Sequence, residues 1–188
     1  MEIIMIDISG ISKDTIVTLY SEDVDNEFDE FYDYVNGFII ACNNEKLVLA
    51  CIDRYGENNG FLLLRLESIY RIDYGSFYEK KLESLYRLKK ERHPSIDFYK
   101  ENSTFTQQIL LWAYEMKKII LVKFPYSSSE ICGYIEDLKT YKINIIDKYE
   151  CKPEQGDSYI DPEKADYIWV DGRRLKDADI VYKARKDD

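Results

Sequence analysis

The residue types that most often carry catalysis are sparse in this 188-residue chain. Its single histidine, His93, stands beside Pro94 at the expected end of a helix, and no serine or cysteine sits in a recognisable nucleophile elbow. As a helix cap or a surface residue, His93 needs no further role. The chain also lacks a Walker phosphate loop and a G-x-G-x-x-G dinucleotide motif. The sequence therefore predicts a non-enzymatic protein with no catalytic residue and no cofactor.

Carboxylates offer two further candidate sites. Asp53 and Asp147 stand at the ends of two expected strands, where they would form a paired-carboxylate site if the strands faced each other. An Asp at a strand end more often starts a turn, and we favour that interpretation. A calcium loop is suggested by acids at alternate positions, Asp23-x-Asp25-x-Glu27-x-Asp29. This segment lacks the glycine at its sixth position and the glutamate at its twelfth, where Tyr34 stands, so we predict no metal site.

The segment from Glu22 to Tyr34 mixes acids with aromatic residues and contains no basic residue. It is too charged for a core strand and predicts a long loop. Exposed rings among acids can dock a basic protein surface, because the rings anchor and the charge steers the approach. The candidate partner-binding residues are Asp25, Glu27, Phe28, Asp29, Glu30, Phe31 and Tyr32. The alternative left open is that the rings fill a barrel while the acids face water.

Three arginines are candidate anion-binding groups. Arg65 and the pair Arg173-Arg174 stand near the ends of two strand-rich stretches, and each side chain could hold a phosphate or a carboxylate. They support an alternative function, a sensor that binds a small molecule or nucleotide at the seam between two barrels.

Charge and composition narrow the function classes. The formal net charge is −10, and residues 1–75 carry 15 acids against 5 bases. Such a surface repels phosphate backbones, so we expect no nucleic-acid partner. No apolar run approaches the roughly 18 residues of a membrane span, and the amino terminus does not resemble a signal peptide. Four cysteines without a C-x-x-C pair favour buried thiols in the cytoplasm over disulfides or zinc.

Short strands are expected to position these residues. Residues with strand preference predict strands at 3–8, 15–20, 35–42, 46–53, 61–66 and 69–73. Asn43-Asn44 predicts a tight turn. Capping boxes at Ser76-x-x-Glu79 and Thr104-x-x-Gln107 predict two helices. A further strand is expected at 119–124, and residues 151–164 form an unusually long loop.

The strand-rich stretches share a faint internal repeat. Gly37 and Gly133 each lie in an apolar strand, and Asp53 and Asp147 end the strand that follows. The repeat would close with Arg65-Leu66 and 69–72 in the first copy and with Arg174-Leu175 and 180–182 in the second. It predicts a first small β-barrel at 1–75, a helical connection at 76–118 and a second small β-barrel at 119–188.

The stretches 37–40, 47–53, 60–66 and 69–73, followed by a capped helix, resemble the SH3-like and Sm-like small barrels found in tandem in uncharacterised bacterial proteins. The resemblance implies a mainly β fold with a helical connection (α+β), in which two five-stranded barrels are joined by a helix pair. Such barrels bind peptides, RNA or small ligands through loops and strand edges, and the acidity of this chain argues against RNA. We therefore expect an intracellular protein-interaction module with a basic protein or peptide partner, one form being an inhibitor or immunity-type protein. Exposed edge strands leave a homodimer as an alternative.

Overall fold

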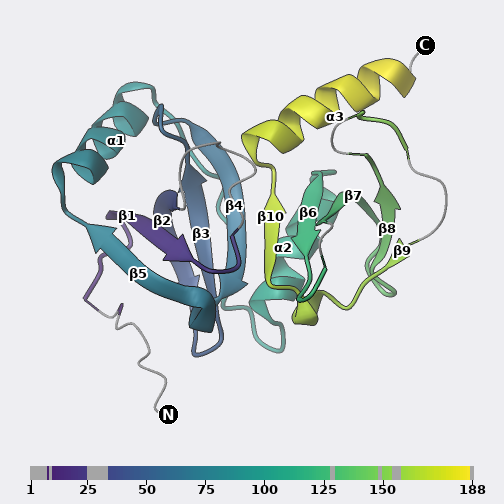
Figure 1. Ribbon diagram of the computed structural model, residues 1–188, viewed down its shortest axis with the longest axis horizontal. Helices are drawn as coiled ribbons and strands as arrows, with labels where there is room; N and C mark the ends of the chain where they lie inside the picture. The colour runs from purple at the N-terminus through teal and green to yellow at the C-terminus, as the bar shows by residue number, and fades with distance from the viewer. Residues whose placement is uncertain are drawn as a thin grey trace. The chain divides into compact units, whose positions relative to one another are not determined.

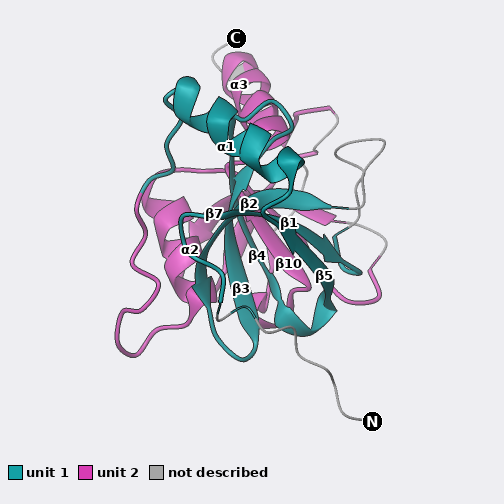
Figure 2. Ribbon diagram, turned by 90° about the vertical axis from the view of Figure 1, so that its left-hand side faces the viewer, with its two compact units in different colours: residues 1–94 teal, residues 95–188 magenta. Residues whose placement is uncertain are grey.

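The computed structural model describes residues 8, 10–24, 34–127, 130–147, 150–153 and 158–186 (Figure 1). The chain divides into two compact units, residues 1–94 and residues 95–188, which Figure 2 shows in different colours. Each unit combines one antiparallel sheet with helices, so the predicted class, mainly β with helices, is confirmed.

Unit 1 is a five-stranded antiparallel sheet followed by one helix. Its strands lie in the order β5-β1-β2-β3-β4. The elements are β1 (Ile16–Ser21), β2 (Val35–Cys42), β3 (Lys46–Ile52), β4 (Asn58–Arg65), the short 3₁₀ helix η1 (Leu66–Ser68), β5 (Ile69–Tyr74) and α1 (Phe77–Leu88). The strand predicted at 3–8 lies almost wholly outside the described residues.

Burial explains why these residues form the sheet. Every residue of β3 is buried, and this interior strand pairs with β2 on one side and β4 on the other. Leu82 of α1 packs with Ile16 and Ile52 of the sheet. The predicted turn at Asn43 is confirmed, because its side-chain oxygen accepts hydrogen bonds from the N–H groups of Glu45 and Lys46.

Unit 2 repeats this arrangement with a helix added at its start. Its strands lie in the order β10-β6-β7-β8-β9 and are also antiparallel. The elements are α2 (Phe105–Glu115), β6 (Ile120–Lys123), β7 (Glu130–Asp137), β8 (Lys142–Ile145), β9 (Ser158–Tyr159), the 3₁₀ helix η2 (Pro162–Lys164), β10 (Tyr167–Val170) and α3 (Arg173–Lys186). In both units the fifth strand pairs with the first and follows a 3₁₀ helix.

The two glycines of the predicted repeat occupy equivalent positions. Gly37 of β2 pairs with a residue of β3, and Gly133 of β7 pairs with a residue of β8. A Cβ on Gly37 would lie 2.2 Å from the carbonyl oxygen of Ala50, and a Cβ on Gly133 would lie 2.1 Å from that of Asn144. The pairing shifts two residues after each glycine. Close backbone approach therefore demands glycine at both sites.

The end of the predicted repeat is wrong. The strand equivalent to β5 is β10, whereas Arg174-Leu175 and residues 180–182 lie in α3. Leu175, Ala178 and Tyr182 are buried at spacings of three and four residues, as one face of a helix requires. The apolar stretch Ile180-Val181-Tyr182 suggests a strand only when it is read without these neighbours.

The two helices that follow the first sheet fall on either side of the division between the units. Both predicted capping boxes are present, Ser76 with Glu79 at α1 and Thr104 with Gln107 at α2. However, the division between units falls at 94/95, so α1 belongs to unit 1 and α2 to unit 2. The predicted boundaries at 75/76 and 118/119 do not coincide with this division. In unit 1 β5 and β4 lie at opposite ends of the strand order, and the pairings of the described residues do not close a barrel.

Candidate functional site

The predicted partner-binding residues, Asp25, Glu27, Phe28, Asp29, Glu30, Phe31 and Tyr32, all lie outside the described residues. Their neighbours in the sequence are described. Val24 is buried and Asp23 holds the guanidinium of Arg65, so the chain before the segment is attached to β4. After the segment, Tyr34 leads directly into β2.

Four tyrosines meet on unit 1 where this segment ends. The Tyr20 ring lies 5.7 Å from the Tyr34 ring and 6.1 Å from the Tyr70 ring, and Tyr34 lies 6.1 Å from Tyr78. The guanidinium of Arg71 stacks over Tyr20 at 4.6 Å. We call Tyr20, Tyr34, Tyr70 and Tyr78 the tyrosine cluster. It joins residues of β1, β5 and α1 with the residue that precedes β2.

A buried polar network links α1, which carries Tyr78 of the cluster, to β1 and β2. Thr18 of β1 donates a hydrogen bond of 2.7 Å to Glu79 of α1, and the N–H of Ser76 donates one of 2.9 Å to the same carboxylate. Asn36 reaches the Tyr78 hydroxyl at 3.3 Å. Burial alone would raise the pKa of Glu79, but these hydrogen bonds outweigh burial and lower it. Glu79 is therefore a charged anchor that fixes α1 and Tyr78 against β1.

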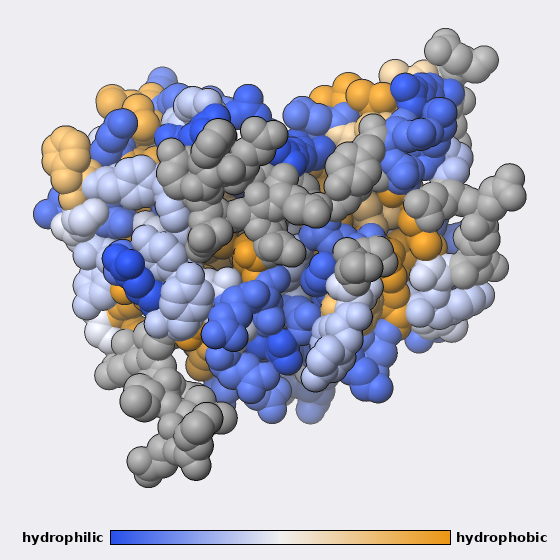
Figure 3. Space-filling view, viewed as in Figure 1, coloured by the Kyte–Doolittle hydropathy of each residue, from blue (hydrophilic) through white to orange (hydrophobic). Residues whose placement is uncertain are grey.

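The surface around the cluster is apolar and exposed. Tyr70 is 55% exposed, and Tyr74 and Phe77 are 56% and 86% exposed. Figure 3 shows exposed hydrophobic side chains over α1. Arg71 is paired with Asp73 at 2.6 Å, so its charge is balanced locally. Large exposed aromatic residues are typical of interaction surfaces, since a ring buries much area while losing few rotamers.

His93 has a structural role. Its Nε2 lies 2.9 Å from the carbonyl oxygen of Cys51, and its Nδ1 lies 2.8 Å from the hydroxyl of Tyr86. Since a carbonyl only accepts, Nε2 carries a proton, and in the neutral ring Nδ1 accepts from the Tyr86 hydroxyl. The ring also stacks on Tyr86 and meets the edge of Phe61. These contacts hold the chain after α1 against β3.

Asp53 and Asp147 both begin turns. The Asp53 side chain accepts hydrogen bonds from the N–H groups of Tyr55 and Glu57. The Asp147 side chain accepts one from the N–H of Glu150. This is the turn-forming role that we favoured. The two residues also lie two positions after the strand partners of Gly37 and Gly133, so their equivalence in the repeat is confirmed.

The candidate anion-binding arginines are not equivalent to one another. Arg65 ends β4 and forms ion pairs with Asp23 at 3.1 Å and Glu67 at 3.2 Å. Arg173 and Arg174 are exposed in the first turn of α3. The predicted equivalence of Arg65 with Arg173-Arg174, which suggested a common role, is therefore wrong.

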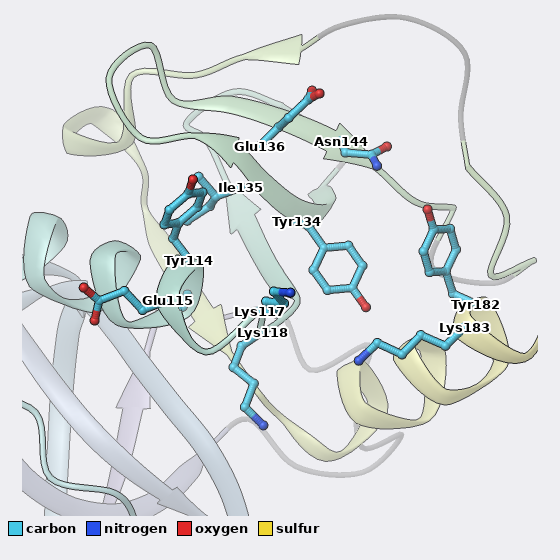
Figure 4. Close-up of a pocket in the computed structure, with 11 residues that line it drawn as sticks. Tyr114, Glu115, Lys117, Lys118, Tyr134, Ile135, Glu136, Asn144, Tyr182 and Lys183 are labelled. Atoms are coloured by element: carbon cyan, nitrogen blue, oxygen red, sulfur yellow. The ribbon is translucent and has the colours of Figure 1, made fainter. Parts of the chain in front are cut away.

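Unit 2 contains a pocket that we did not predict. It has a volume of about 540 Å³ and lies between the end of α2, the strands β7 and β8, and the second half of α3 (Figure 4). Its rings and ammonium groups come from Tyr114, Lys117, Lys118, Tyr134, Tyr182 and Lys183. A tyrosine followed closely by lysine occurs twice in this set, at Tyr114 and at Tyr182. The second occurrence lies in α3, part of which we had predicted to be a strand.

The middle of the pocket is organised by Tyr134 of β7. Its hydroxyl donates a hydrogen bond to Asp179 of α3, whose other oxygen binds Lys183 at 2.8 Å. Burial and the bond to Asp179 raise the pKa of Tyr134, so its phenol stays protonated and acts as a donor. The Tyr134 and Tyr182 rings lie 5.8 Å apart at an angle of 45°. The two rings and the hydrogen-bonded group Tyr134–Asp179–Lys183 therefore shape this part of the pocket.

No family model, curated protein or solved structure matches this chain. None of the helices in the described part of the chain combines the length and the apolar character needed to cross a membrane. All four cysteines are free, and Cys51 and Cys132 are buried.

Proposed function

We propose that this chain is a non-enzymatic binding protein of the cytoplasm, and that it binds a protein partner with a basic surface. The contact would combine the tyrosine cluster of unit 1 with the acidic segment 25–33. The observation that carries this proposal is the aromatic surface in which the exposed Tyr70 meets the half-buried Tyr20 and Tyr34, two residues that flank that segment in the sequence.

Charge complementarity supports this choice of partner. Residues 22–33 contain seven acids and no base, and they lie within the most acidic third of the chain. Acids at the edge of an interface speed association with a positively charged partner, whereas desolvated rings at its centre supply most of the affinity. An inhibitor or immunity-type protein that blocks a basic target is one concrete form of this function.

We also propose that each unit is a small barrel of the SH3-like or Sm-like kind. The shared strand order, in which the fifth strand pairs with the first, supports this proposal, and so do the equivalent glycines of β2 and β7. Barrels of this type use loops and strand edges for binding, and the tyrosine cluster involves the terminal strand β5.

The function is tested by affinity capture of the tagged protein from cells at low and high salt, followed by mass spectrometry. The test variant neutralises four acids: Asp25→Asn, Glu27→Gln, Asp29→Asn and Glu30→Gln. A matched control neutralises four exposed acids of unit 2: Asp97→Asn, Glu101→Gln, Glu115→Gln and Asp177→Asn. Both variants change the net charge equally, so any difference in capture between them depends on where the neutralised acids lie.

We expect a basic protein that is captured by the wild type and the control at low salt and is lost at high salt, because surface charges are screened. The test variant should capture less of it, and the salt dependence of the remainder should be weaker. Equal capture by the test and control variants would refute the role of the segment. A partner without a basic surface would refute the proposed partner class.

A further inference from the structure

We propose that the pocket of unit 2 binds a planar aromatic anion, meaning a small ring compound that carries a carboxylate or a phosphate. This site is independent of the surface proposed for protein binding, because all of its lining residues belong to unit 2. Either proposal can therefore fail without affecting the other.

The size of the pocket fits a small molecule. Its volume of about 540 Å³ falls within the range of about 300–1,000 Å³ typical of small-molecule sites. The fold fixes the wall formed by β7 and α3, since Tyr134 lies in β7 and its hydroxyl is hydrogen bonded to Asp179 of α3. The end of α2 is fixed by hydrogen bonds from the N–H groups of Lys117 and Lys118 to the last helical carbonyls. The site is thus built before any ligand arrives.

The arrangement of charge favours an anion. Lys183 is balanced by Asp179, and Lys118 is balanced by Asp171 at 3.1 Å. Lys117 is exposed and forms no ion pair with any described residue, so no described carboxylate pairs with its ammonium group. Lys117 and Tyr134 both line the pocket and are drawn in Figure 4.

The acids of the pocket do not cancel this charge. Glu115 and Glu136 are both exposed. In Figure 4 their carboxylates lie at the rim and point away from Tyr134. Among the residues that line the pocket, three ammonium groups, those of Lys117, Lys118 and Lys183, stand against the two carboxylates of Glu115 and Glu136. One lysine without an ion pair to a described residue suits one negative group on the ligand.

The rings determine the rest of the ligand. Tyr134 and Tyr182 present aromatic surface, and Ile135 and Ala113 add apolar lining. Flat aromatic molecules pack against such rings in offset or edge-on geometry. Asn144 of β8 lies at the opposite side from Lys117 in Figure 4 and offers both a donor and an acceptor for a polar ring substituent.

The inference is tested with a pair of probes of nearly the same shape, the anion 2-naphthoate and its neutral amide, 2-naphthamide. Binding is measured by titration calorimetry, and the site is located by amide chemical shifts in the full-length labelled protein. The test variant is Lys117→Met and the control is Lys90→Met. Lys90 and Lys117 occupy the same position after their helices, with φ of 59° and 50°, so the two substitutions have matched backbone consequences.

We expect 2-naphthoate to bind with a Kd of about 1 mM or tighter, as its size allows. Its shifts should fall on β7, β8, the end of α2 and α3. Lys117→Met should weaken binding about threefold, as for loss of one exposed ion pair, and Lys90→Met should not change it. The amide should bind about threefold more weakly than the acid.

Three results would overturn the inference. The first is equal binding of acid and amide, which would leave a pocket without anion preference. The second is equal binding by the Lys117 and Lys90 variants. The third is the absence of saturable binding, or shifts confined to unit 1, either of which would show that the pocket does not take ligands of this class.

Discussion

The buried carboxylate of Glu79 gives the sharpest prediction for the surface of unit 1. Glu79 is 4% exposed and accepts hydrogen bonds of 2.7 Å from Thr18 and 2.9 Å from the N–H of Ser76. In Glu79→Gln the amide oxygen can still accept one of these two hydrogen bonds. The amide NH₂ group faces the second donor and cannot accept from it. Since a hydrogen bond to a charged group contributes about 1.5–3 kcal/mol, the free energy of unfolding should fall by about 2 kcal/mol.

The effect of Glu79 should depend on pH with a defined sign. Its pKa is lowered in the folded protein, so its stabilisation is complete above the unfolded carboxyl pKa of about 4.3 and is lost as the pH falls through the folded value. The difference between wild type and Glu79→Gln should therefore be constant from about pH 7 to 5 and shrink below about pH 4.

Urea unfolding at several pH values measures this difference. Glu83→Gln is the matched control, because Glu83 lies on the same helix and pairs at the surface with Arg87. An exposed pair of this kind contributes less than about 1 kcal/mol, so the control should lose little stability. If Glu79→Gln costs no more than Glu83→Gln, or if its cost does not change with pH, the assignment of Glu79 as a charged anchor is wrong.

Two further predictions concern the fold. Gly37→Ala and Gly133→Ala should each lower the free energy of unfolding by about 3 kcal/mol or more, because the added methyl would lie 2.2 Å and 2.1 Å from backbone carbonyl oxygens. A loss in only one of them, seen by thermal or urea unfolding, would contradict the structural repeat. His93→Leu leaves the carbonyl oxygen of Cys51 and the hydroxyl of Tyr86 without this partner, and it should cost about 1–3 kcal/mol. Partner capture by folded His93→Leu protein should be unchanged, and a loss of capture would argue against a purely structural role.

Local features of the fold were predictable from the sequence. Gly37 and Gly133 mark close backbone contacts, Asp53 and Asp147 mark turns, and the capping boxes mark both helix starts. Each of these depends on a residue type and its near neighbours. Such features can be recognised from the sequence because the residue type that marks them needs no identified long-range partner.

Features that depend on distant contacts were not predictable. The segment 180–182 is apolar enough for a strand, and only the burial of Tyr182 together with Leu175 and Ala178 identifies α3. With α3 unrecognised, Tyr134 of β7 and Asp179 of α3 could not be brought together, so the pocket was missed. The tyrosine cluster was missed in part for the same reason, since Tyr20, Tyr34 and Tyr70 meet only through strand pairing.

The most direct test of the proposed function is the Kd of the captured partner, measured for wild type, Tyr70→Ser and Tyr159→Ser at about 50 mM and about 300 mM salt. Tyr159 is the control, because it is 61% exposed, against 55% for Tyr70, and both residues lie in the terminal strand of their unit's sheet. The proposal predicts about tenfold weaker binding for Tyr70→Ser at both salt concentrations, wild-type binding for Tyr159→Ser, and weaker binding of all three proteins at the higher salt. Equal affinities of Tyr70→Ser and Tyr159→Ser, or affinities that do not change with salt, would contradict it.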